Sequence, residues 1–540
     1  MFAPQNQQPN VIDSMSGSME EWYNAIDDAV KKSEVIPGNY EYTVATSYGN
    51  VGPISEGSST YFDVSCDRFK VVSLDNSFIT IEQDVEVEIP KHQETSNKAI
   101  TTYYIGYKYA GDVIDQYRLY SNTDLIQTQN HARYEWFMMY NSISDEAKRN
   151  SDLYATLDKI REKNPFVPGV YVDVGAISDT TKTIQVHLKV RVPVSAFLTL
   201  FNLRFFPNWS GKLSIEIYPS YKNLCIVPVV PQKYLLSDKL QEKIAGGPSV
   251  VELGFKNINQ PMKNHLVVAN FGASGEAWTI TAQTFKCNGT NCKADKCKIR
   301  LATYLLKMDV FNALAAKYIQ VPLIFPIQTI QIKDFTNGIP NGEGHFTTAN
   351  TLALKHCDAL FAVFKKDVNA RTCFENPFIK FQFNVDGKLY PREQTETYND
   401  ERFINQNLDA LNLNNSLITS PSKDLRNSLQ PFHELNTYNN STGKLDSNKV
   451  WNDGDFSNFM IGIPFCDSED FYGGISTTGT VQIELAGERP SGALSATSYT
   501  ATAICFEDCL LKVRAMKPNG RSQIEITNAS IEELLRGLAY

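Results

Sequence analysis

Apolar and polar residues alternate along much of this chain with the period-two spacing of half-buried β-strands. Clear cases are Ile79–Glu82, Val85–Ile89, Thr183–Val192 and Lys212–Tyr218, and Pro90 ends the second of them. Successive side chains of a strand lie on opposite faces, so each of these segments turns one face to a core. The pattern therefore predicts a predominantly β protein.

Helical spacing occurs near both ends of the chain. Trp22, Ile26 and Val30 recur every fourth residue after a capping-box pair, Ser18 and Glu21. A second capping box at Ser530 precedes four apolar residues, Ile531, Leu534, Leu535 and Leu538. An apolar helix stripe must be covered, so these seven side chains are candidate contact residues. They pack either on their own β domain or on a neighbouring subunit, and both alternatives stay open.

Three segments of the first half are matched, in the same order, by segments of the second half. The pairs are Leu119–Ile126 with Phe383–Tyr390, Val190–Ser195 with Ile461–Cys466, and Gly211–Ile217 with Gly479–Leu485. Their offsets lie between 264 and 271 residues. Agreement of three matches in order and spacing predicts two tandem copies of one large β domain. Duplicated β domains without catalytic residues are usually building material.

The domain organisation follows from this repeat and from the Gly/Pro punctuation. We expect an N-terminal arm and helix over 1–37, a first β domain over 38–235, a linker over 236–248 and a second β domain over 249–527. A helix over 528–540 ends the chain. The Asn/Ser-rich stretch near 399–450 has few strand signals and is too long for a simple connection, so it is expected to project as a loop or tower.

Composition excludes several classes of protein. The net charge of −9 argues against a protein that coats nucleic acid, and no specific nucleic-acid recognition is expected. No apolar run is long enough for a transmembrane helix, and the N-terminus lacks the blocks of a signal peptide. Ten cysteines without paired spacing are typical of reduced thiols.

Candidate chemical sites are few. Cys287, Cys292 and Cys297 invite a zinc interpretation, but their C-x4-C-x4-C spacing differs from a zinc knuckle, so an ordinary lysine-rich loop is favoured and the metal alternative stays open. His356 and Cys357 are adjacent, and adjacent strand residues point to opposite faces, so they do not form a nucleophile pair. Asp467–Asp470 lacks the spacing of a calcium loop, which favours capping or turn chemistry.

A longer run carries a family resemblance. Val190–Phe201, followed by Arg204–Pro207 and Gly211–Ile217, resembles a recurrent segment of the double jelly-roll major capsid proteins of the Polinton/Maverick, adintovirus and virophage group, within the adenovirus hexon-like lineage. Arg118–Asn122 and Asp358–Phe364 are similar to strands of the same family. The close motif covers about thirty residues, whereas the two-copy layout covers nearly the whole chain.

The resemblance implies an all-β fold of two tandem eight-stranded jelly rolls, with short helices in loops and at both termini. It implies a structural major capsid protein whose pseudo-hexameric homotrimers tile an icosahedral shell. Such a protein is located in the virion, after synthesis and assembly inside the host cell. Its partners are further copies of itself, neighbouring capsomers, penton and minor capsid proteins, with the terminal helices as clamps.

Two other functions compete with this hypothesis. One is a two-domain β-sandwich attachment or carbohydrate-binding protein that uses Tyr-rich loops and the insertion near 399–450. The other is an enzyme on a jelly roll, such as a cupin or glycosidase. The sequence has no G-x-S-x-G, H-E-x-x-H or P-loop motif. It therefore favours a protein that is not an enzyme and needs no cofactor or metal.

Overall fold

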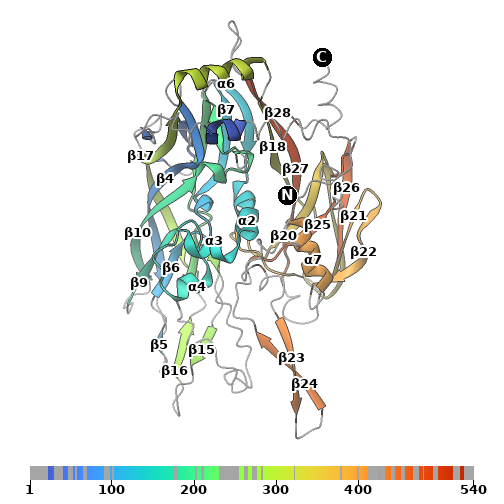
Figure 1. Ribbon diagram of the computed structural model, residues 1–540. Helices are drawn as coiled ribbons and strands as arrows, with labels where there is room; N and C mark the ends of the chain where they lie inside the picture. Colours follow the sequence, from blue (N-terminus) through green and yellow to red (C-terminus); the bar gives the residue numbers. More distant parts are fainter. Residues whose placement is uncertain are drawn as a thin grey trace.

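The computed structural model describes residues 22–28, 41–46, 53–54, 57–64, 70–90, 98–99, 102–175, 181–200, 203–207, 212–229, 255–260, 265–269, 276–280, 284–320, 323–377, 380–397, 401–411, 425, 432–439, 444–451, 457–465, 474–477, 479–489, 497–514 and 523–527. Strands make up most of these residues, which confirms the predicted fold class. They form two β sandwiches in chain order, called here the first roll and the second roll (Figure 1).

The first roll is one long antiparallel ribbon folded back on itself. Its eight strands are β1 (Glu41–Thr46), β3 (Thr60–Val64), β4 (Lys70–Pro90), β7 (Ile114–Ser121), β8 (Asp124–Gln129), β10 (Thr181–Pro193), β12 (Leu213–Pro219) and β17 (Lys286–Leu305). The first strand pairs with the eighth, the second with the seventh, the third with the sixth and the fourth with the fifth. The resulting sheets, β1-β17-β4-β10 and β3-β12-β7-β8, are those of a jelly roll.

The second roll repeats this pairing. Its strands are β18 (Leu323–Asp334), β19 (Gly344–Ala353), β20 (Cys357–Lys365), β21 (Lys380–Val385), β22 (Lys388–Glu396), β25 (Ile461–Pro464), β26 (Thr480–Arg489) and β27 (Thr500–Arg514). They pair first with eighth, second with seventh, third with sixth and fourth with fifth. The sheets are β18-β27-β20-β25 and β19-β26-β21-β22.

The three sequence matches occupy equivalent places in the two rolls. The first match is the hairpin of the fourth and fifth strands, β7–β8 in one roll and β21–β22 in the other. The second match contains the sixth strands, β10 and β25, and the third contains the seventh, β12 and β26. The prediction of two tandem copies of one β domain is confirmed.

The division between the copies differs from the predicted one. β17 pairs with both β1 and β4, so the first roll extends to Leu305. Helix α6 (Met308–Gln320) then leads to β18. The predicted linker 236–248 lies inside the connection from β12 to β17, where Gly and Pro punctuate an insertion within one domain. The described strand Lys286–Leu305, predicted to lie in the second domain, therefore belongs to the first roll.

The remaining strands and helices lie outside the sixteen strands of the two rolls. Short strands are β2 (Pro53–Ile54), β5 (Lys98–Ala99), β6 (Thr102–Gly106), β9 (Gly169–Asp173), β11 (Phe205–Pro207), β13 (Cys225–Pro228), β14 (Lys256–Asn257), β15 (His265–Ala269), β16 (Glu276–Ile280), β23 (Phe432–Asn439), β24 (Lys444–Trp451) and β28 (Gln523–Thr527). Helical elements are a turn over 22–28, η1 (Ala110–Val113), α2 (Ala132–Ser142), α3 (Asp145–Asn150), α4 (Leu157–Arg161), η2 (Val194–Ala196), η3 (Leu198–Leu200) and α7 (Glu401–Ala410).

The large insertions leave each roll from the same end. Successive strands of the ribbon run in opposite directions, so the connections that follow the third, fifth and seventh strands share one end of the sandwich. In the first roll these connections hold β5–β6, α2 to β9, and β13–β16, and in the second roll one holds α7 and the hairpin β23–β24. Figure 1 shows β5, β15, β16, β23 and β24 at one end, and α6 across the other. The insertion predicted near 399–450 thus contains a projecting hairpin.

Candidate functional site

The predicted chemical residues are mostly structural where they are described. Cys287 and Cys297 are buried in β17, so the stretch predicted as a lysine-rich loop is instead a strand paired with β4. Cys292 lies on the same strand. Among the residues that the structure describes, no group of three or more His, Cys, Asp or Glu side chains is placed to hold a metal ion.

His356 and Cys357 do not form a reactive pair. His356 is in the left-handed region (φ +48°), and its Nδ1 lies 3.3 Å from the Ser476 hydroxyl. Cys357 is buried, and a hydrogen bond with Cys505, together with burial, raises its thiol pKa. A thiol kept protonated in this way is a poor nucleophile. Asp467–Asp470 lies outside the described residues.

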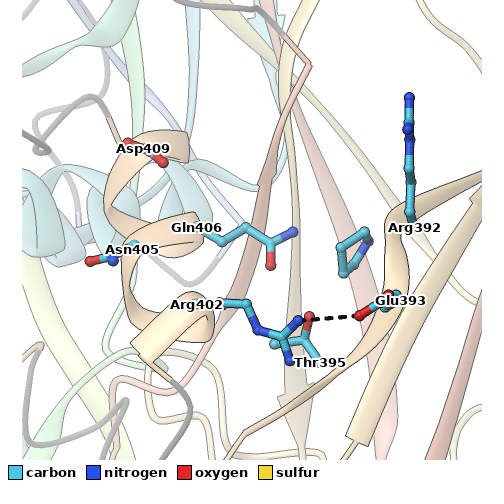
Figure 2. A pocket seen from close by; sticks show the side chains of 8 residues that line it. Arg392, Glu393, Thr395, Arg402, Asn405, Gln406 and Asp409 are labelled. Carbon is cyan, nitrogen blue, oxygen red and sulfur yellow. Dashed lines mark hydrogen bonds and ion pairs between the residues drawn. The ribbon is translucent and has the colours of Figure 1, made fainter.

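One open pocket lies between β22 and α7 in the second roll (Figure 2). Its volume is about 480 Å³, and polar and charged side chains line most of it. The only ion pair drawn there joins Arg402 to Glu393 at 3.4 Å, and both side chains are largely exposed. Exposed pairs of this kind contribute little energy and leave both groups hydrated. The pocket therefore lacks the enclosed apolar walls of a typical small-molecule site.

The most elaborate polar and aromatic arrangement lies instead between the two rolls. We call it the inter-roll contact: helix α2 of the first roll, the segment 367–374 that follows β20 of the second roll, and the residues these two touch. Phe374 is fully buried, 4.7 Å from the Phe137 ring in an edge arrangement and 6.0 Å from the Tyr134 ring in a stacked one. These aromatic pairs join the rolls across a dry surface.

Helix α2 serves two cores at once. Ala132, Trp136 and Tyr140 belong to the core of the first roll, whereas Tyr134, Phe137 and Met138 belong to that of the second. The exchange is mutual, because side chains of β18 and β27 lie in the first core; they are Leu323, Phe325, Ile327, Cys509, Leu511 and Val513. The rolls therefore share apolar surface in both directions and are expected to behave as one body.

Polar groups complete the inter-roll contact. Arg371 of the second roll makes an ion pair of 2.5 Å with Asp115 and donates through Nε to Asn223 Oδ1 at 2.9 Å. Asn257 Oδ1 accepts from the backbone N–H groups of Arg371 and Thr372 at 2.8 and 3.0 Å. These bonds fix the segment 367–374 on the first roll, since buried polar groups keep their partners.

A buried carboxyl group of α2 connects the helix to neighbouring segments of the first roll. Glu135 accepts hydrogen bonds from the Tyr117 hydroxyl at 2.9 Å and from the Leu198 backbone N–H. Burial raises the pKa of Glu135 to about 7, although these donors oppose the shift. The group therefore lies close to half ionised near neutral pH.

The predicted terminal contact residues are only partly described. Trp22 and Ile26 are fully buried in the core of the first roll, and Trp22 Nε1 donates to Phe205 O at 3.1 Å. Both side chains therefore pack on their own domain. Val30, Ile531, Leu534, Leu535 and Leu538 lie outside the described residues. Within the described part of the chain, no helix has the length and apolar character to cross a bilayer.

Sequence reasoning missed the inter-roll contact. Arg371, Phe374 and Lys108 carry no motif, and their partners lie more than 100 residues away in the sequence. The surplus of aromatic residues between Tyr134 and Tyr140 is the one local signal that points to it.

Comparison with known proteins gives likenesses of fold. No family model matches the sequence, and no curated protein matches it either. Among solved structures, the chain is similar to a chain of the Sputnik virophage (10% identity, TM-score 0.48, covering 93% of this chain and 91% of that one). It is also similar to the mavirus major capsid protein (10%, 0.48, 93% and 93%) and the Faustovirus major capsid protein (9%, 0.39, 88% and 90%).

Proposed function

We propose that this chain is a structural major capsid protein that forms pseudo-hexameric homotrimers and tiles an icosahedral viral shell. The observation that carries the proposal is the repeated jelly-roll pairing in two rolls with their insertions at the same end. Jelly rolls serve mainly as capsid, lectin and cupin domains. A duplicated pair, joined through shared cores, suits a load-bearing block more than a soluble binding module.

Symmetry gives the block its shape. Three copies related by a three-fold axis place six rolls of one topology around a ring, which has a near-hexagonal outline. The insertions leave from one end, so the side walls of each roll stay free for edge-to-edge contact. Such obligate contacts commonly bury roughly 2,000 Å² or more. Neighbouring capsomers, penton and minor capsid proteins are the partners this role requires, and the virion is its location.

Light scattering on the full-length chain after size exclusion tests the proposal. We expect a mass three times that of the 60.7 kDa chain, and particles with a hexagonal outline in electron micrographs. A monomer that binds glycans would instead support the attachment protein, and hydrolysis or oxidation of a substrate by purified protein would support an enzyme.

The C-terminal apolar residues remain a proposed contact between subunits or with minor capsid proteins. Deletion of 528–540 should leave each roll folded and lower the fraction of trimer or shell. Unfolding of the truncated chain would instead place Ile531, Leu534, Leu535 and Leu538 in the core of their own subunit.

A further inference from the structure

A buried lysine of the first roll extends into the second. Lys108 lies between β6 and η1, and its Nζ donates to Asn458 Oδ1 and Ser457 Oγ, each at 2.7 Å, and to Ser457 O at 3.3 Å. Lys108 is 2% exposed and Asn458 is 0% exposed. Buried lysines are rare because removing an ammonium group from water is costly. The amine and the side-chain amide are thus held together away from solvent.

The backbone fixes Asn458 in this position. Phe374 N–H donates to Ser457 O at 2.7 Å, and Phe459 N–H donates to Phe374 O at 3.2 Å. Asn458 also forms an isolated parallel bridge with Phe374. The main chain of Asn458 is therefore held next to Phe374. Because Nζ bonds to the amide oxygen, the amide carbon lies one covalent bond beyond that contact, in the range where a held nucleophile and electrophile react.

A buried carboxyl group that is able to move protons interacts electrostatically with Lys108. Asp112 is buried, its Oδ2 accepts from Tyr109 N–H at 3.2 Å, and its Oδ1 has no hydrogen-bond partner among the described residues. Burial raises the pKa of Asp112 to about 8, against the opposing effects of the Tyr109 N–H and the Lys108 charge. A carboxyl group with such a pKa takes up and releases a proton near neutral pH.

The surroundings exclude water. Tyr104, Cys225 and Phe255 are fully buried, and Lys108 Nζ lies 5.2 Å from the centroid of the Phe255 ring. Burial penalises both the ammonium form of a lysine and the carboxylate form of an aspartate. The neutral amine is the nucleophilic form of lysine. Water cannot compete with it for the amide carbon.

We propose that Lys108 and Asn458 form an intramolecular isopeptide bond that joins the two rolls covalently. Starting from the neutral amine, Nζ bonds to Cγ of Asn458, the Cγ–Nδ2 bond breaks, and ammonia leaves. Asp112 starts as the neutral acid, gives its proton to the departing Nδ2 and takes up the proton that Nζ loses, so the carboxyl group ends as it began. No atom is oxidised or reduced, and no external reactant takes part. The reaction does not depend on the proposed capsid function.

The bond would close a loop between residues 350 positions apart. A covalent closure of this length restricts the unfolded chain strongly, as a long-range disulfide does, but it does not respond to reducing agents. The rolls would then stay tethered even when the inter-roll contact opens.

Mass spectrometry of the full-length protein tests the proposal. We expect the intact mass to be lower than the sequence mass by one ammonia, and proteolysis to release one branched peptide that joins Lys108 to Asn458. Lys108→Arg should restore the full mass and slow the migration of the denatured chain on a gel. Asp112→Asn should leave the chain linear even in folded protein.

Lys159 provides the matched control. It is also buried, but its Nζ donates to the backbone carbonyl groups of Ser151, Tyr154 and Phe166. Lys159 should remain in a linear peptide, and Lys159→Arg should keep the cross-link. Recovery of unmodified Lys108 and Asn458 in linear peptides of folded wild-type protein at full yield would overturn the proposal, whatever the variants do. The oligomer mass, measured separately, reports on the capsid function and not on this bond.

Discussion

The two rolls share one pairing order but are interrupted differently. The second roll proceeds through its strands with one large insertion, which holds α7 and the β23–β24 hairpin. The first roll has insertions after its third, fifth and seventh strands, and reaches its last strand only at Lys286. Two elements that bind the rolls together lie outside the shared strands: α2, from an insertion of the first roll, and the segment 367–374, from the connection between β20 and β21 of the second. The common topology provides the two blocks, and the differences between them provide the contact.

Among the predicted changes, a cavity in the inter-roll contact should lower the stability of the protein most. Phe374→Ala removes a buried ring that touches α2, and should cost about 3–5 kcal/mol. Because the lost contacts join the rolls, denaturant unfolding should split into two transitions. Phe383→Ala removes an equally buried ring inside the second roll and should lower stability similarly without that split. Matching unfolding profiles for the two variants would mean that the rolls are not coupled through Phe374.

Removal of the ion pair between Arg371 and Asp115 should cause the next largest loss of stability. Arg371→Ala leaves Asp115 and Asn223 without this partner in a partly buried site, and should cost about 2–3 kcal/mol. Arg402→Ala removes an exposed arginine of the second roll and should change stability by less than about 0.5 kcal/mol. Chemical denaturation at low and high salt measures both. An Arg371 variant as stable as the Arg402 variant would show that the segment 367–374 is held by packing alone.

The pH dependence of stability should differ between a buried carboxyl group of the first roll and an exposed one of the second. The pKa of Glu135 is raised by burial to about 7 from 4.5, so the unfolded chain releases this proton first as the pH rises. The group therefore lowers stability progressively between about pH 4.5 and pH 7, by on the order of 2–3 kcal/mol, and adds no further loss above that range. Glu135→Gln should flatten this slope. Glu393→Gln, at an exposed carboxyl group of the second roll, should leave it unchanged.

The smallest change in stability is expected from substitutions in the equivalent hairpin turns, β21–β22 in the second roll and β7–β8 in the first. In the second roll, Asp386 and Gly387 have φ of +51° and +82°, as a two-residue hairpin turn requires. A Cβ on Gly387 meets nothing within 4 Å, so Gly387→Ala should cost only the backbone strain, about 1 kcal/mol. In the first roll, Thr123→Ala should be neutral within about 0.5 kcal/mol. Thermal unfolding compares them, and equal melting temperatures would contradict the strain argument.

Sequence patterns predicted the β class and the duplication because both leave periodic signals. The hairpins β7–β8 and β21–β22 alternate along the chain and end in recognisable turns, so their equivalence was visible before any pairing was known. Helix α2 gave no such signal: most of its side chains are buried, by two different cores, so it lacks the polar face that marks a surface helix.

The end of the first roll escaped prediction for a related reason. The N-terminal half of β17 is rich in Lys, Asn and Cys and does not alternate, and it is a strand because β4 supplies backbone partners over its length. Strand formation dictated by a partner two hundred residues away is invisible to a local pattern. The inter-roll contact was unpredictable on the same ground, since Arg371 and Asp115 meet only after both rolls have folded.

The late position of β17 bears on biosynthesis. β17 lies between β1 and β4, so this sheet stays split, with two unpaired edges, until residue 305 has left the ribosome. Nascent chains with open strand edges are prone to pair with one another, most of all when many are translated at once from a single message. A chaperone that shields β1 and β4 during translation, or fast decoding through codons 286–305, would therefore raise the yield of correctly folded protein.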